Sequence, residues 1–230
     1  MKILGMKIQT GRQVNKKMRR TYRNKTIVLL MAIVIMIAGC GKEQIQNIEN
    51  INNINNDRKI EKTIQSNEEE IIKVDFNQKF LNISGKSAEE TVEEIKNGGN
   101  CLDIYENEDG TVTVEINKKQ QEYWMDSRGT MMEELQEQFK EYDQNYRLEH
   151  NDSFTEVNAY YNLELPADKA IVYVRYAEFL CASYQLFSGV NSDEWKVVIN
   201  VYNSDTGKLV KTGDSDVDLT YDNSDWEASK

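Results

Sequence analysis

The chain has 230 residues, with 39 acidic and 28 basic side chains, which gives a formal net charge of −11 at pH 7. All 39 acidic residues but only 19 basic residues follow Gly39, so the chain from Cys40 onwards has a net charge near −20. Such an acidic surface repels nucleic acid and anionic headgroups, so DNA and RNA partners are disfavoured, whereas cationic peptides and metal ions are attracted. The 191 residues from Cys40 onwards leave room for one domain with flexible ends.

An apolar run without charge extends over residues 26–39, close to the start of the chain. A membrane-spanning helix needs about 20 apolar residues, so this run is short. Six basic residues come just before it: Lys16, Lys17, Arg19, Arg20, Arg23 and Lys25. A basic region, a short apolar region and small residues at the cut are typical of a secretory signal. Met1 and Met18 are both candidate start sites, because a signal of this kind does not need residues 1–17.

The run ends in Ile37-Ala38-Gly39-Cys40, which resembles the lipobox of bacterial lipoproteins. The resemblance implies a signal peptide at residues 1–39, cleavage between Gly39 and Cys40, and attachment of diacylglycerol to the Cys40 thiol, with further acylation (palmitate) of the new N-terminus. The protein is then expected on the extracytoplasmic face of a bacterial cell membrane, held there by lipid. The alternative is an N-terminal anchor that stays uncleaved.

Residues 40–85 are expected to form the lipidated cysteine and a flexible tether, because they are rich in Asn, Gln, Glu and Lys. As a random coil, about 45 residues reach about 40 Å. Four isoleucines recur at every third position: Ile45, Ile48, Ile51 and Ile54. On a helix, this spacing moves the apolar stripe around the surface, whereas a coiled-coil seam needs alternating spacings of three and four. The pattern therefore favours a spacer over a coiled coil. A short element near the end of the tether is expected to dock onto the domain through Val74, Phe76, Phe80, Leu81 and Ile83.

Residues 86–213 carry the signals of a globular domain. Ser87 and Glu90 fit a capping box at the start of a helix, and Gly98-Gly99 ends it. Alternating apolar residues on both sides of the turn at residues 107–110 predict a β-hairpin. Asn117, with Gln120 three residues later, predicts a long second helix, which Arg128 and Gly129 interrupt midway.

The same pattern recurs further along the chain. Residues 146–150 and 157–161 alternate around a second turn, and Pro166 begins a helix that runs to about Ser188. Apolar residues cover that helix nearly all round, so we expect it to be the most buried. Residues 195–201 and 209–211 then predict a third hairpin.

Helix, strand, strand thus occurs three times, which predicts an α+β domain: one mostly antiparallel sheet with about three helices packed on it. The remaining residues, 214–230, carry a series of carboxylates and are expected to form an acidic, disordered tail.

Few residues are candidates for chemistry. His150 is the only histidine, so neither HExxH nor a His-rich metal site can form. Cys101 or Cys181 could pair with His150 as a nucleophile, although a thiolate on the apolar face around Cys181 would be unfavourable; the two cysteines can equally form a disulfide or stay reduced. Residues 214–218 are similar to the start of a calcium loop, but Leu219 stands where an EF-hand needs Gly. We expect no metal, no cofactor and no catalytic site.

Beyond the lipobox, the stretches NGGNCLDIYENEDGTVTVEINKKQQEYW, NSDEW and NSDTGKLVK resemble uncharacterised small lipoproteins of low-GC Gram-positive bacteria. That resemblance implies no activity. The sequence therefore predicts a non-enzymatic module at the cell envelope that binds an envelope protein or peptide. The alternatives are an envelope hydrolase that uses carboxylates and a small solute-binding lipoprotein.

The lipobox makes one prediction independent of the fold. Cys40→Ala removes the thiol that receives the lipid, so we expect the variant to lose fatty-acid labelling and normal signal cleavage. Metabolic labelling with a fatty-acid probe, followed by the size of the mature protein on a gel, measures both. A Cys40→Ala protein that still labels and matures normally would show that the lipobox interpretation is wrong.

Overall fold

The computed structural model describes residues 70–217 and 219–230. By its contacts the chain divides into two units, residues 1–61 and 62–230, and every described residue belongs to the second. The expected signal peptide, Gly39, Cys40 and most of the expected tether therefore lie outside the described residues. No helix in the described ranges is long and apolar enough to cross a membrane.

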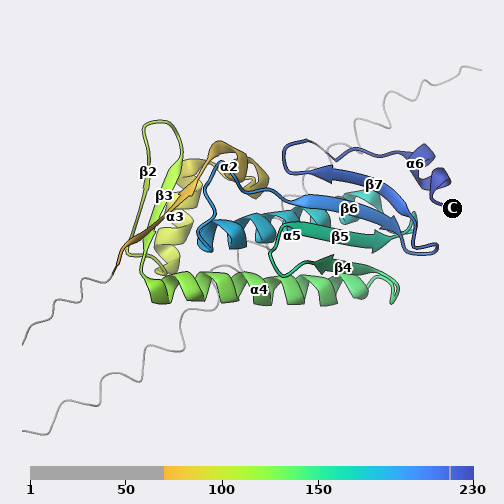
Figure 1. The fold of residues 1–230 in the computed structure, drawn as a ribbon, viewed down its shortest axis with the longest axis horizontal. Helices are drawn as coiled ribbons and strands as arrows, with labels where there is room; N and C mark the ends of the chain where they lie inside the picture. Colours follow the sequence, from red (N-terminus) through yellow and green to blue (C-terminus); the bar gives the residue numbers. More distant parts are fainter. Residues whose placement is uncertain (1–69, 218) are drawn as a thin grey trace, which may run out of the picture. The chain divides into compact units, whose positions relative to one another are not determined.

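The first part of the domain is a three-stranded antiparallel sheet, sheet A, in the order β1-β3-β2 (Figure 1). It consists of β1 (Ile72–Phe76), β2 (Asp103–Glu106) and β3 (Val112–Ile116). Two helices lie between β1 and β2 in the chain: α2 (Gln78–Ser84) and α3 (Ala88–Gly98). The capping box of Ser87 and Glu90 forms as predicted, with Gly99 in the left-handed conformation at the other end of α3.

The domain begins earlier than the expected boundary at residue 86. Val74 and Phe76 of β1 and Phe80 and Leu81 of α2 are all buried, as expected for an element that docks onto the domain. Because β1 pairs with β3, however, this segment is a strand of the sheet and not an appendage of the tether.

A second sheet, sheet B, has the order β4-β5-β6-β7. Its strands are β4 (Arg147–His150), β5 (Glu156–Tyr161), β6 (Val198–Asn203) and β7 (Leu209–Asp214). The hairpins β4–β5 and β6–β7 are antiparallel, as predicted, but β5 and β6 pair in parallel. A parallel pair needs a crossover connection, which here is α5 (Ala167–Phe187).

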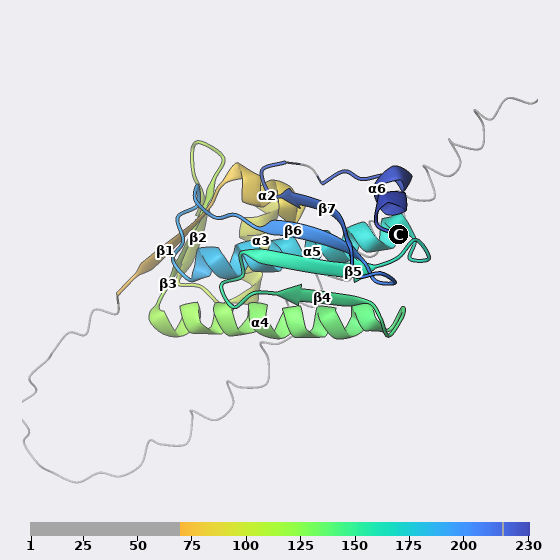
Figure 2. The ribbon, with the colours of Figure 1, turned by 45° about the vertical axis from the view of Figure 1, so that its right-hand side comes forward.

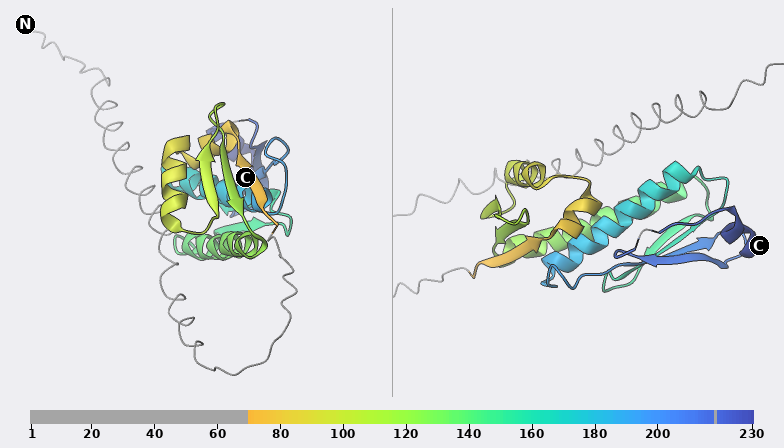
Figure 3. Two further views of the ribbon diagram at one scale, coloured as in Figure 1. Left: turned by 90° about the vertical axis from the view of Figure 1, so that its left-hand side faces the viewer. Right: turned by 90° about the horizontal axis from the view of Figure 1, so that it is seen from above.

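Helices α4 (Lys118–Lys140) and α5 pack against each other and cover one face of sheet B (Figures 2 and 3). Burial alternates along β5 and β6, with every second side chain directed towards these helices. The other face carries no other described element. Helix α5 has 11 buried residues, which confirms the prediction that it is the most buried helix.

The fold class, α+β, and the threefold helix-strand-strand order are as predicted, but the layer arrangement differs. The expected single sheet is two sheets, and the described residues contain five helices instead of about three, because α2 and α6 (Asn223–Ala228) add to the predicted ones. Helix α4 also runs without interruption through Arg128 and Gly129.

The expected disordered tail at residues 214–230 is likewise corrected. Asp214 ends β7, and α6 follows with a capping box formed by Asp222 and Asp225. Trp226 is only 4% exposed, with its ring 5.3 Å from that of Tyr161 on β5. Burying one large aromatic side chain stabilises this segment in spite of its carboxylates.

The central position of α5 predicts unequal effects of two substitutions on it. Leu180 is fully buried, so Leu180→Ala should lower the free energy of unfolding by about 2–5 kcal/mol, through lost transfer energy and the cavity left behind. Lys169→Ala, in the first turn of the same helix, should change it by less than about 0.5 kcal/mol. Thermal or urea unfolding of the two variants measures the difference, and equal, small effects would contradict a buried α5.

Candidate functional site

The residues proposed from the sequence as reactive groups do not come together. Gly39 and Cys40 lie outside the described residues. Cys101 and Cys181 are both free thiols, and burial raises the pKa of each. Cys181 is fully buried on α5, where a thiolate would be unfavourable.

His150 lies at the end of β4 and takes part in local contacts. Its ring lies tilted against that of Phe154, with 4.3 Å between the centroids, and its Nδ1 is 2.9 Å from the backbone oxygen of Asn151, which can only accept a hydrogen bond. Phe154 has a φ of 55°, an uncommon value for a residue with a side chain, which places its ring between His150 and Tyr184. Within the described residues, neither thiol hydrogen-bonds to His150.

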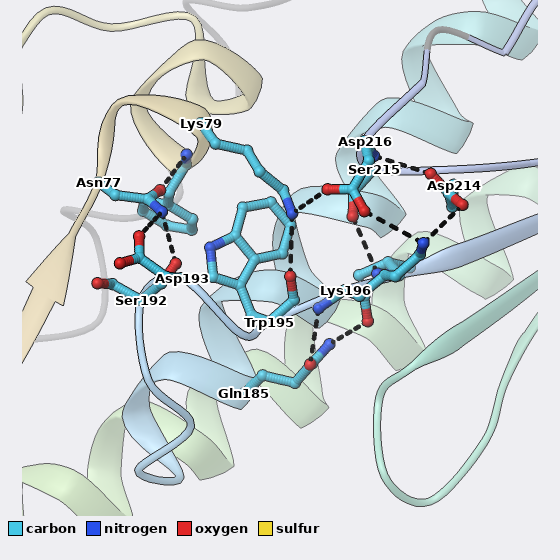
Figure 4. Close-up of polar contacts among 12 residues, drawn as sticks. Asn77, Lys79, Gln185, Ser192, Asp193, Trp195, Lys196, Asp214, Ser215 and Asp216 are labelled. Atoms are coloured by element: carbon cyan, nitrogen blue, oxygen red, sulfur yellow. Dashed lines mark hydrogen bonds and ion pairs between the residues drawn. The ribbon is translucent and has the colours of Figure 1, made fainter.

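The segment that is similar to the start of a calcium loop forms ion pairs with two lysines through Asp214 and Asp216 (Figure 4). Lys196 Nζ lies 2.8 Å from Asp214 Oδ2 and 3.1 Å from Asp216 Oδ2, and Lys79 Nζ lies 2.6 Å from Asp216 Oδ1. Residue 218 is outside the described ranges. No group of three or more potential metal-ligating side chains of His, Cys, Asp or Glu is found among the described residues.

These contacts form a clasp, which we define as Lys79, Trp195, Lys196, Asp214 and Asp216. Lys79 Nζ lies 3.9 Å above the Trp195 ring and donates to the Trp195 backbone oxygen at 3.0 Å. The clasp thereby joins α2, which belongs to the first part of the domain, to the segments that flank β6 and β7. We interpret it as a structural contact, because its opposite charges already pair with one another.

A pocket of about 190 Å³ lies where the parallel strands β5 and β6 end. It is lined by Asn162, Leu163, Glu164, Asn203, Asp205, Thr206, Trp226 and Lys230. In open sheets, ligands bind where the carboxyl ends of parallel strands meet diverging loops. Here the loop after β5 leads to α5, the turn after β6 leads to β7, and α6 supplies a wall with Trp226.

Internal hydrogen bonds hold the polar wall of the pocket in place. Asn162 Nδ2 donates to Asp205 Oδ1 at 3.0 Å, and Asn162 Oδ1 accepts from the Tyr146 hydroxyl at 2.6 Å. Asn203 Nδ2 donates to Ser229 Oγ at 3.1 Å, and Thr206 Oγ1 donates to the Ser229 backbone oxygen at 2.6 Å. The end of α6 is therefore fixed to the turn after β6.

The pocket is acidic. Within the described ranges, neither Glu164 nor Asp205 forms an ion pair with a basic side chain, whereas the lining residue Lys230 pairs with Glu227 at 2.6 Å. Burial, and then the charges of Asp143, Glu164 and Asp205, raise the pKa of Tyr146. The negative potential therefore reaches into the polar wall, and an incoming cation would be attracted by it.

Sequence reasoning did not find this pocket. Its residues belong to two connections 40 positions apart and to the segment expected to be disordered. Each connection alone has the composition of an ordinary turn, and only the parallel pairing of β5 with β6 brings them together. Trp226 was the one available signal, as a large aromatic residue in an otherwise polar segment.

The chain matches no protein-family model, no curated protein and no solved structure. Function is therefore inferred from the contacts and charges of the described residues.

The clasp predicts a dependence of stability on acid pH. Lys79, then Lys196, lowers the pKa of Asp216, and Lys196 lowers that of Asp214. Carboxyl groups with a folded pKa below the unfolded value, about 4, stabilise the fold above that value and lose the effect as the pH falls through the folded pKa. We expect the melting temperature to fall as the pH is lowered from about 5 to 3, and to fall less in Lys79→Met.

The readout is the difference between the melting temperatures at the two pH values, because Lys79→Met also removes a contact with Trp195 and lowers stability at every pH. Lys140→Met, which removes an exposed charge on α4 paired with Glu137, is the control. Parallel acid profiles of Lys79→Met and the unaltered protein would contradict the assignment.

Proposed function

We propose that this protein is a lipid-anchored, non-enzymatic binding module on the extracytoplasmic face of the cell membrane, and that its pocket takes a cationic group of an envelope peptide or protein. The anchor follows from the lipobox at Cys40. The observation that carries the binding proposal is the pocket at the ends of β5 and β6, where Glu164 and Asp205 lack basic partners within the described domain.

The chemistry of the pocket suits an ammonium or guanidinium group. Carboxylates hold such groups through charge-assisted hydrogen bonds, and an indole ring attracts a cation over its face. Glu164 and Asp205 are the carboxylates of the pocket lining, and Trp226 is its aromatic residue. A volume of about 190 Å³ fits a side chain or a chain terminus and not a whole folded partner.

The hydrolase alternative makes a separate demand on the carboxyl groups. A glycosidase needs one carboxyl group with a raised pKa to act as the acid. Five described carboxyl groups do not meet this demand, because hydrogen bonds lower their pKa: Glu90, Asp109, Asp214, Asp216 and Asp222.

The proposal is tested by titrating the full chain in detergent micelles with n-butylammonium and n-butylguanidinium at low salt, where exposed charges are least screened. The indole N–H resonance of Trp226 reports on the pocket. We expect saturable shifts with both cations and none with n-butanol. Asp205→Asn and Glu164→Gln should each weaken binding about two- to fivefold, as expected for partly exposed charge pairs.

Glu108→Gln is the matched control, because it removes the same charge from the exposed turn between β2 and β3. Equal affinities in Glu108→Gln, Asp205→Asn and Glu164→Gln would mean that general acidity, and not the pocket, attracts the cation. Shifts that n-butanol reproduces would reject a cation site altogether.

A further inference from the structure

The polar side chains around the pocket at β5 and β6 use their hydrogen-bond donors within the wall itself. The Asn203 amide donates twice to Ser229, to Oγ at 3.1 Å and to the backbone oxygen at 3.5 Å. The Thr206 hydroxyl has a single donor, which the Ser229 backbone oxygen accepts. Asn162 Nδ2 donates to Asp205 Oδ1 at 3.0 Å. These side chains therefore have little left to donate to a ligand.

Acceptors, by contrast, remain available in the same lining. Neither oxygen of the Glu164 carboxylate accepts a hydrogen bond from a described residue, and the same holds for Asp205 Oδ2. An ionised carboxylate can only accept hydrogen bonds. The two carboxylates belong to different connections, which Asn162 holds together by its hydrogen bond to Asp205. A ligand that matches this surface therefore has to bring several donors of its own.

The aromatic side chain of the lining is mostly covered by protein. Trp226 is only 4% exposed. Its ring lies 5.3 Å from that of Tyr161, in a tilted arrangement, and 6.3 Å from that of Tyr221, edge on. Sites that hold a quaternary ammonium group surround it with the faces of aromatic rings, whereas Trp226 is the one aromatic residue among the described residues of this lining. Trp226 therefore offers apolar contact to the atoms behind a cation more than it holds the charge.

We propose that the ligand of this pocket is the unmethylated side-chain ammonium group of a lysine residue in a peptide or protein, which rests on the cation site proposed above. The ammonium group carries three N–H donors, and Asp205 Oδ2 and the Glu164 carboxylate accept them. The apolar stem of the lysine lies against Leu163 and Trp226, in a pocket of about 190 Å³. The ammonium group of a chain terminus is attached directly to the backbone and brings no such stem.

Trimethylation of the lysine separates attraction by charge from recognition by hydrogen bonds. A trimethylated lysine keeps its positive charge but has no N–H donor, so only its hydrogen bonds to Asp205 and Glu164 are lost. Charge-assisted hydrogen bonds are roughly twice as strong as neutral ones, so this loss should be measurable even in an open pocket. The preference for lysine over trimethyl-lysine is therefore the property to measure.

The experiment uses the full chain in detergent micelles at low salt and follows the indole N–H resonance of Trp226, assigned by its loss in Trp226→Phe. The probes are the peptide acetyl-Gly-Lys-Gly-amide, its trimethyl-lysine and acetyl-lysine forms, and Gly-Gly-Gly-amide, whose only charge is its terminal ammonium group. We expect the lysine peptide to shift the resonance saturably and the acetyl-lysine peptide to cause no shift. The trimethyl-lysine peptide and Gly-Gly-Gly-amide should each bind at least about fivefold more weakly than the lysine peptide.

Asp205→Asn and Glu164→Gln test the assigned acceptors through the ratio of two affinities, that for the lysine peptide over that for the trimethyl-lysine peptide. Each substitution should lower this ratio at least about twofold, because it removes an acceptor that only lysine uses. An effect of charge alone would weaken both peptides equally and leave the ratio unchanged. Asp152→Asn, which removes the same charge from the exposed turn at the other end of β5, is the matched control and should keep the original ratio.

The outcomes separate this proposal from the one on which it rests. Equal affinities for lysine and trimethyl-lysine, or a ratio that both carboxylate variants leave unchanged, would mean that the pocket attracts charge without recognising N–H donors. Binding of Gly-Gly-Gly-amide as tight as that of the lysine peptide would identify a chain terminus as the ligand and overturn the assignment of lysine. If neither the peptides nor n-butylammonium shifts the resonance, the cation site itself is rejected.

Discussion

The fold depends on the burial of α5, which connects two strands that lie next to each other and point the same way. A parallel pair cannot be closed by a short turn, so the connection must cross the face of the sheet. Helix α5 does this while it also contacts α4, α2 and β1. Its apolar surface is therefore covered from several directions, and the two sheets share one hydrophobic core through it.

The same parallel pair produces the pocket. In an antiparallel hairpin, one strand ends where the next begins, and a tight turn closes that edge. Strands β5 and β6 instead end together, so the chain must leave the sheet twice at the same place, once towards α5 and once through the turn at residues 204–208. Their side chains line a space that α6 then encloses on one side. Glu164 in one connection and Asp205 in the other give that space its negative charges.

Local signals in the sequence predicted local structure well. The capping boxes at Ser87 and Asn117 depend on a side chain three residues away, and both form as predicted. The three hairpins follow from alternation around a turn. The pairing of β1 with β3 and of β5 with β6 depends on contacts between residues 36 to 44 positions apart, which no local pattern encodes. This is why one sheet was predicted where two exist.

The segment after β7 was misjudged for a related reason. Its many carboxylates indicate a solvated chain. The overall composition of a segment, however, does not reveal what one of its residues contacts. A single buried contact, Trp226 with Tyr161, decides its structure, and this contact depends on where β5 lies in space. The pocket could not be predicted because its wall was assigned to a disordered tail.

Buried polar side chains between α5 and its neighbours fall into two kinds. The Gln185 amide donates to the backbone oxygens of Phe154 and Lys196 and accepts from the backbone N–H of Lys196, so its hydrogen bonds fix the segments that precede β5 and β6. Gln121 likewise donates to the backbone oxygen of Phe187, at the end of α5. A buried polar group with its partners in place stabilises one arrangement of the chain.

Arg128 is as deeply buried as these two glutamines, and it contacts a hydroxyl, a sulfur and two aromatic rings, those of Trp124 and Phe179. If its role were only to join α4 to α5, a neutral side chain would reach Ser183 without placing a charge in the interior. The rings of Trp124 and Phe179 favour a charge at this position, because the face of an aromatic ring attracts a cation. Arg128 therefore joins α4 to α5 through a hydrogen bond and ring contacts together.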